Sequence, residues 1–218
     1  MNNAVDKAKP LYTVGEEISN AITHGIGAGL SVAGTVLLII RAAILSDAMS
    51  VVASAIYGGS LILLYMMSTM YHSLTNETAK KVFRIFDHCT IFILISGTYT
   101  PYTLVTLRGW IGWSIFGTLW GLTALGIVFN SISIEKAKKF SLIAYILMGW
   151  CIVIAIKPTI AGLGFYGMFF VLLGGVFYTV GVIFYKMKKV RYMHSVWHLF
   201  VLAGSIFQYF SIFFWVIK

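Results

Sequence analysis

The sequence predicts an all-α fold, a bundle of seven transmembrane helices in one integral membrane domain over residues 1–218. Composition is the first observation: 59% of the residues are hydrophobic and 11% are charged, whereas soluble domains carry about 25% charged residues. A soluble globule of this size cannot hide so much apolar surface. The same composition excludes disordered chains, disulfide scaffolds, collagen and nucleic-acid-binding domains.

Seven apolar runs, each near the roughly 20 residues that a spanning helix needs, are the second observation. The first run follows a polar segment, residues 1–18, which we expect to be cytoplasmic and to contain no cleaved signal peptide. The third and fourth runs are separated only by Arg108-Gly109, and Pro101 predicts a kink within the third. In order, the expected spans are 19–42, 48–72, 83–107, 109–130, 140–157, 163–186 and 194–217.

Basic residues concentrate in alternate loops, which is the third observation. Twelve of the 16 Lys and Arg residues fall on the side of the amino terminus: Lys7, Lys9, Lys80, Lys81, Arg84, Lys136, Lys138, Lys139, Lys186, Lys188, Lys189 and Arg191. The positive-inside rule therefore predicts a cytoplasmic amino terminus, an external carboxyl terminus and an odd number of spans in the plasma membrane. We expect the net charge of +9 to attract anionic lipid at the cytoplasmic face, and no nucleic acid.

Few ionisable side chains enter the expected spans, and they share one depth. With this orientation they all lie near the cytoplasmic end: His24, His72, Asp87, His88, His194 and His198. Ionisable groups in a membrane are costly and usually line a cavity or bind something. All five histidines of the chain are in this layer, so it is the candidate functional site.

His194 and His198 are four residues apart, so both imidazoles project from one helical face and can reach one metal ion. His72 offers a third nitrogen at the same depth. Three imidazoles with one open position are typical of a catalytic zinc site, where a bound water has a pKa of about 7. The alternative for the pair is two histidines at the level of the lipid head groups.

Two more residues are candidates for the chemistry. Ser68 precedes His72 by one helical turn and presents a hydroxyl on the same face, although it could instead bond back to its own helix. Asp87 could hold a water as a base or orient a ligand, or it could simply cap the start of the third span.

The other polar residues have simpler interpretations. Glu16, Glu17 and Asn20 favour the start of the first helix through its dipole, or close the cytoplasmic mouth, or pair with the basic loops. His88 points about 100° away from Asp87 around the helix and faces another neighbour. Neither His24 nor His88 receives a role. We expect Cys89 and Cys151, which lie in apolar runs, to form no disulfide and bind no metal.

The motifs occur in the order of a known family. They are E-E-x-x-N-x-x-T-H from Glu16 to His24, S-x-x-x-H from Ser68 to His72, D-H-x-x-I-F from Asp87 to Phe92, G-T-Y-T-P-Y from Gly97 to Tyr102, and H-x-x-x-H from His194 to His198. Over nearly its whole length the chain resembles the haemolysin III family, the bacterial branch of the progestin and adipoQ receptor superfamily. The resemblance implies seven helices, a cytoplasmic amino terminus, zinc on His72, His194 and His198, and water near Asp87 and Ser68.

The wider superfamily includes alkaline ceramidases, which cleave lipid amides in membranes. The leading functional hypothesis is therefore a zinc-dependent hydrolase of a lipid amide or ester in membrane lipid homeostasis, with Asp87 moving protons. One alternative is a membrane sensor, similar to a receptor, in which zinc only fixes helices together. A second is a cytolytic membrane protein, which rests on the family name alone.

Overall fold

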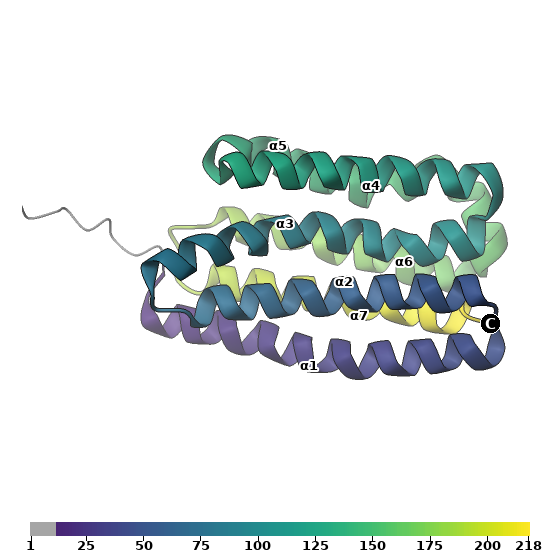
Figure 1. Ribbon diagram of the computed structural model, residues 1–218, viewed down its shortest axis with the longest axis horizontal. Helices are drawn as coiled ribbons and strands as arrows, with labels where there is room; N and C mark the ends of the chain where they lie inside the picture. The colour runs from purple at the N-terminus through teal and green to yellow at the C-terminus, as the bar shows by residue number, and fades with distance from the viewer. Residues whose placement is uncertain (1–11) are drawn as a thin grey trace, which may run out of the picture.

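The computed structural model describes residues 12–218, and the elements of that range are helices joined by short connections. The helices run along one axis, with α4 and α5 at one edge, α1 at the other, and α2, α3, α6 and α7 between them (Figure 1). Their bounds are α1 Val14–Leu45, α2 Ala48–Ser73, α3 Glu77–Pro101, α4 Gly109–Ile132, α5 Ile134–Gly149, α6 Ile156–Lys186 and α7 Met193–Ser211. The expected all-α class is confirmed.

Six segments of the described chain are long and apolar enough to cross a membrane. Five of them correspond to single expected spans. The remaining one, Ile134–Lys186, is 53 residues long and contains α5, a 3₁₀ turn at Cys151–Ala155, and α6. Lys7, Lys9 and residues 1–11 of the expected amino-terminal segment lie outside the described residues.

The surface polarity of the helices is inverted relative to that of a soluble protein. On α1, Ile18, Ile22 and Ile26 recur every fourth residue, and each is more than half exposed. Polar residues of the same helix, among them Asn20 and His24, are buried. Because lipid cannot satisfy polar groups, these side chains turn inward, away from the hydrocarbon. This arrangement is that of a protein whose solvent is hydrocarbon.

The first helix starts five residues earlier than the sequence pattern predicted. Thr13 caps α1 in a reciprocal box: the Glu16 amide donates to its hydroxyl, and the Glu16 carboxylate accepts from the Thr13 amide at 2.8 Å. Glu16 therefore stabilises the start of α1, which is one of the interpretations that the sequence allows.

Asp87 does not cap a helix, so that interpretation is wrong. Helix α3 begins at Glu77, where the Asn76 side chain accepts from the Ala79 amide at 3.0 Å. The sequence pattern placed the start later because Lys80, Lys81 and Arg84 make the first turns polar. Asp87 lies well inside α3, and its side chain is buried.

Pro101 is the last residue of α3, and the third span, Glu77–Leu107, changes its helical type there. The chain continues from Tyr102 to Leu107 as a π-helical turn, and Arg108, with a φ of 38°, turns it into α4. Proline has no amide to donate, which frees a carbonyl in the preceding turn and favours a change of helical type.

Helix packing brings the layer of histidines to one end of the bundle. Helix α1 packs against α2 and α7, and α6 packs against α7. At this end α1, α3 and α7 begin and α2 ends, and the carboxyl terminus lies at the opposite end (Figure 1). The basic residues flanking the α2–α3, α4–α5 and α6–α7 connections lie at the histidine end as well.

Candidate metal centre

Three histidines from two distant parts of the chain meet at this end. His72 comes from the last turn of α2, and His194 and His198 come from the first turns of α7. Each offers a ring nitrogen, and these three atoms lie within 4.8 Å of one another. The ring centroids of His194 and His198 are 4.6 Å apart, and those of His72 and His198 are 5.2 Å apart. The arrangement could hold a metal ion.

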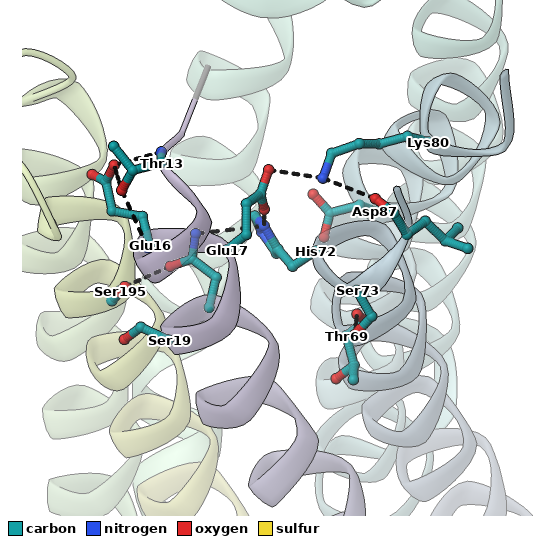
Figure 2. Close-up of polar contacts among 12 residues, drawn as sticks. Thr13, Glu16, Glu17, Ser19, Thr69, His72, Ser73, Lys80, Asp87 and Ser195 are labelled. Atoms are coloured by element: carbon teal, nitrogen blue, oxygen red, sulfur yellow. Dashed lines mark hydrogen bonds and ion pairs between the residues drawn. The ribbon is translucent and has the colours of Figure 1, made fainter. Parts of the chain in front are cut away.

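A carboxylate on α1 orients His72. The Nδ1 atom of His72 lies 2.6 Å from Oε2 of Glu17, and the other oxygen of Glu17 accepts from Nζ of Lys80 at 2.7 Å (Figure 2). A carboxylate that already accepts from lysine is ionised, so Nδ1 carries the proton and donates. The Nε2 atom of His72 then holds a lone pair, which a metal ligand requires.

The backbone of α1 orients His198 in the same way. Its Nδ1 lies 3.3 Å from the carbonyl oxygen of Asn20 and 3.2 Å from the Thr23 hydroxyl oxygen. The Thr23 hydroxyl donates to the Ser19 and Asn20 carbonyls, so toward His198 it can only accept. Nδ1 is therefore the donor, and Nε2 of His198 also presents a lone pair.

These lone pairs fit a metal. Among residues 12–218, the buried Nε2 atoms of His72 and His198 have no hydrogen-bond partner. A buried polar atom without a partner costs about 1–3 kcal/mol, so two of them side by side indicate a ligand that the protein atoms do not supply. Neutral imidazoles held by outer hydrogen bonds are the ligand type that zinc and similar metals prefer.

Tyr12 covers the outer side of this centre. Its ring centroid lies 4.8 Å from that of His194 and 5.7 Å from that of His72. Burial raises the pKa of the Tyr12 hydroxyl well above its usual range, so the ring stays neutral. The histidines are thereby screened from solvent at the end of the bundle.

Asp87 and Ser68 remain predictions as catalytic residues, and the structure gives their positions. Asp87 is 7% exposed and lines a cavity together with His194. Ser68 is 1% exposed, one turn before His72 on α2, and its hydroxyl has no hydrogen-bond partner among the described residues. The carboxylate of Asp87 does not belong to the group of ligand atoms that meet within 4.8 Å, which contains the three histidines.

The other two histidines differ from each other. His24 joins the cluster, and its ring stacks on His198 at 3.5 Å between centroids. His88 is anchored through Nδ1, which lies 2.9 Å from the Arg84 carbonyl oxygen. The expectation that His88 faces away from Asp87 is not met, because its Nδ1 lies 3.6 Å from Oδ2 of Asp87 and both residues line the same cavity.

The cavity beside the cluster has a volume of about 160 Å³ and is lined by α2, α3, α5, α6 and α7 together with His24. Its polar end carries Asp87, His88 and His194. Its walls are largely aliphatic and aromatic, and they extend to Gln208, which follows His194 by 14 residues on α7. That spacing corresponds to about 21 Å of helix, so the cavity runs along the bundle.

Sequence reasoning missed the residues that orient the histidines. Glu17, Asn20 and Thr23 lie on the face of α1 that contacts His72 and His198. Their spacing by three in the first motif was the available signal, since it puts them on one helical face. The interpretation of Glu17 as a partner of the basic loops is confirmed by Lys80, but its contact with His72 was not predicted.

The comparisons with known proteins agree with one another. Residues 12–209 match the family model described as Haemolysin-III related. The chain is 46% identical to Hemolysin-3 of Bacillus cereus over 94% of its own length and 93% of that protein. It is 43% identical to a Hemolysin-3 homolog of Bacillus subtilis (strain 168), over 95% and 98% of the two chains. It is 25% identical to the human Monocyte to macrophage differentiation factor, over 90% and 83%.

Proposed function

Since this chain belongs to the haemolysin III family of the progestin and adipoQ receptor superfamily, we propose that it is a zinc-dependent membrane hydrolase acting on a lipid amide or ester. It is a multi-pass integral membrane protein, for which the plasma membrane is the expected location in bacteria. The proposed reaction places it in membrane lipid homeostasis.

One observation carries this proposal: the three-histidine group adjoins a long apolar cavity whose polar end also holds a carboxylate. His194 belongs to both the metal group and the cavity wall, and Asp87 lines the cavity beside it. An apolar cavity of this shape suits an acyl chain, with the polar junction of the lipid at the histidine end. A structural metal site needs neither the cavity nor the carboxylate.

When bound, a zinc ion supplies Lewis acidity and an activated water at neutral pH. The residues of the chain do the rest. His72 and His198 present their Nε2 atoms, and Glu17, Asn20 and Thr23 keep them in that tautomer. The carboxylate of Asp87 takes up a proton from the water that attacks the lipid carbonyl, and it returns this proton to the amine or alcohol that leaves. The aliphatic walls hold the acyl chain and exclude bulk water.

Turnover of lipids by the purified protein tests this mechanism. Wild type, Asp87→Ala and Glu77→Gln are incubated in detergent micelles with labelled ceramides and with labelled acyl esters. Glu77 is the matched control, because it is an exposed carboxylate on the same helix. We expect turnover by wild type and Glu77→Gln, and a loss of about 10²–10⁴-fold in Asp87→Ala. Unchanged turnover in Asp87→Ala, or no turnover of any lipid by zinc-loaded wild type, contradicts the mechanism.

The alternative function is a sensor in which the metal is structural. It is favoured by the fact that His72 and the α7 pair join helices more than 100 residues apart in the chain. For a sensor, metal removal lowers the unfolding temperature while no lipid is turned over. Lysis of cells, which the names of the relatives suggest for those proteins, is checked by adding the purified protein to erythrocytes.

We further propose that Ile134–Lys186 crosses the membrane twice, as α5 and α6, so that seven helices place the amino terminus in the cytoplasm. The end of the bundle that carries the histidines and the basic connections then faces the anionic lipid of the inner leaflet. Single cysteines in a cysteine-free background test this on intact cells with an impermeant maleimide. Ala48→Cys and Ile154→Cys should be labelled and Lys189→Cys should not; protection of Ile154→Cys contradicts the seven-helix count.

A further inference from the structure

His24 is a buried polar side chain that the proposed mechanism does not use. It is 2% exposed, and neither of its ring nitrogens has a hydrogen-bond partner among residues 12–218. Its neighbours are rings: His198 stacked at 3.5 Å between centroids, and Tyr65 edge-on at 5.0 Å. The protein thus holds this ring firmly while leaving both nitrogens unsatisfied, which costs stability unless something else supplies the partner.

The surroundings of His24 show where that partner lies. His24 is part of the cavity wall, together with Asp87 and His194. It is the contribution of α1 to a cavity otherwise lined by α2, α3, α5, α6 and α7. A neutral imidazole offers one N–H donor and one acceptor nitrogen. The cavity therefore has a hydrogen-bonding group at its polar end in addition to the metal group and Asp87.

His24 is distinct from the metal group. The three ligand atoms that meet within 4.8 Å come from His72, His194 and His198. The rings of His24 and His198 are nearly parallel, with 10° between their planes. Ring nitrogens direct their lone pairs and N–H bonds within the ring plane. The nitrogens of His24 therefore point to a site that is offset from the metal position toward which Nε2 of His198 points.

We propose that His24 is a positioning residue that hydrogen-bonds the polar junction of the lipid in the cavity, next to the metal group. This inference rests on the proposed function, which names a lipid amide or ester. The N–H of His24 donates to the carbonyl oxygen of that junction, and the stacked His198 ring fixes the plane from which it donates. His24 thereby distinguishes an acyl lipid with a carbonyl from a plain hydrocarbon of the same length.

Equilibrium binding tests this role without requiring catalysis. The probes are a ceramide with a fluorescent C12 acyl chain and a fluorescent hydrocarbon of equal length that lacks the amide and hydroxyl groups. Both are titrated into zinc-loaded wild type, His24→Phe and His24→Gln in detergent micelles. Phenylalanine keeps the stack on His198 and removes both nitrogens, and glutamine restores a donor and an acceptor. His24→Leu is measured in parallel, in case the phenylalanine variant does not fold.

We expect His24→Phe to keep the metal content of wild type and to bind the ceramide about tenfold more weakly, the value of one hydrogen bond. Its affinity for the hydrocarbon should be unchanged, and His24→Gln should recover part of the loss. Without lipid, the phenylalanine variant should unfold at the same or a higher temperature than wild type, because two unsatisfied nitrogens are gone.

Four results overturn the inference: equal ceramide affinity in wild type and His24→Phe, loss of metal from His24→Phe, no ceramide binding by wild type, or equal affinity of wild type for both probes. Equal ceramide affinity, or loss of metal from His24→Phe, contradicts only the role of His24; the proposed hydrolase still holds if wild type turns over lipid. Conversely, a wild type that binds the ceramide through His24 and never cleaves it overturns the hydrolase and keeps the positioning role.

Discussion

Glu17 provides a sharp test of how the metal centre is held. The change is Glu17→Gln, which keeps the size of the side chain and removes its charge. Oε2 of Glu17 accepts from Nδ1 of His72 at 2.6 Å, and Oε1 accepts from Lys80 at 2.7 Å. An amide group in this place holds His72 only through a neutral hydrogen bond, so the lone pair on Nε2 is less basic and less well directed.

The contacts of Glu17 with His72 and with Lys80 contribute different free energies. A hydrogen bond to a charged group contributes about 1.5–3 kcal/mol, which corresponds to about 10–100-fold in zinc affinity. The Lys80 pair is partly exposed, with the side chains 27% and 18% accessible, so it contributes about 0.2–1 kcal/mol. We therefore expect Glu17→Gln to weaken zinc binding about 10–100-fold, and Lys80→Met to weaken it about fivefold or less.

Competition for zinc against a fluorescent chelator, in detergent-purified protein, measures these affinities. Glu16→Gln is the matched control, because Glu16 is the adjacent carboxylate but bonds Thr13 and the Tyr192 amide rather than a histidine. Glutamine also fits its capping position. A zinc affinity of Glu17→Gln within twofold of wild type, or an equal loss in Glu16→Gln, refutes the argument that Glu17 orients His72.

Two further predictions concern the scaffold. A methyl group at Gly112 would clash with the Thr103 carbonyl oxygen, whereas one at Gly117 meets nothing within 4 Å. Thermal unfolding should show Gly112→Ala destabilised by about 1–3 kcal/mol and Gly117→Ala stabilised by up to about 1 kcal/mol. The reverse order contradicts this packing. The pKa of Asp47, between α1 and α2, is lowered to about 2 by the Ser50 amide and then by Ser50 and Arg108 side-chain bonds. Because the folded pKa is below the usual value, the contribution of Asp47 to stability is present at neutral pH and is lost as the pH falls toward 2; a carboxyl ¹³C titration with a midpoint near the ordinary value of 3.8 contradicts it.

The sequence was sufficient to predict which histidines meet. The spacing of His194 and His198 sets both on one helical face, and the alternation of basic loops gives His72 the same depth. Neither argument needs knowledge of how the helices pack. Because the bilayer forces spanning helices to run roughly parallel, the position of a residue within its span gives its depth in the membrane. The all-helical class could be predicted for the same reason.

What the sequence could not provide was the rotation of each helix and the identity of its neighbours. Glu17 could be assigned to the helix dipole, a cytoplasmic mouth or a basic loop, and only the packing of α1 against α2 puts it on His72. The sequence also allows Asp87 as a helix cap, because the polar first turns of α3 obscure the helix start at Glu77. The stack of His24 on His198 likewise depends on how α1 meets α7.

Metal analysis of the purified protein tests the three-histidine centre most directly. The wild-type chain, purified without chelators, is compared with a variant that combines His194→Ala and His198→Ala. We expect about one zinc ion per wild-type chain and none in the variant, since a site reduced to His72 lacks the three protein ligands of a catalytic zinc. A folded wild-type protein that contains no metal and takes up none from a zinc buffer contradicts the centre, and with it both the hydrolase and the sensor.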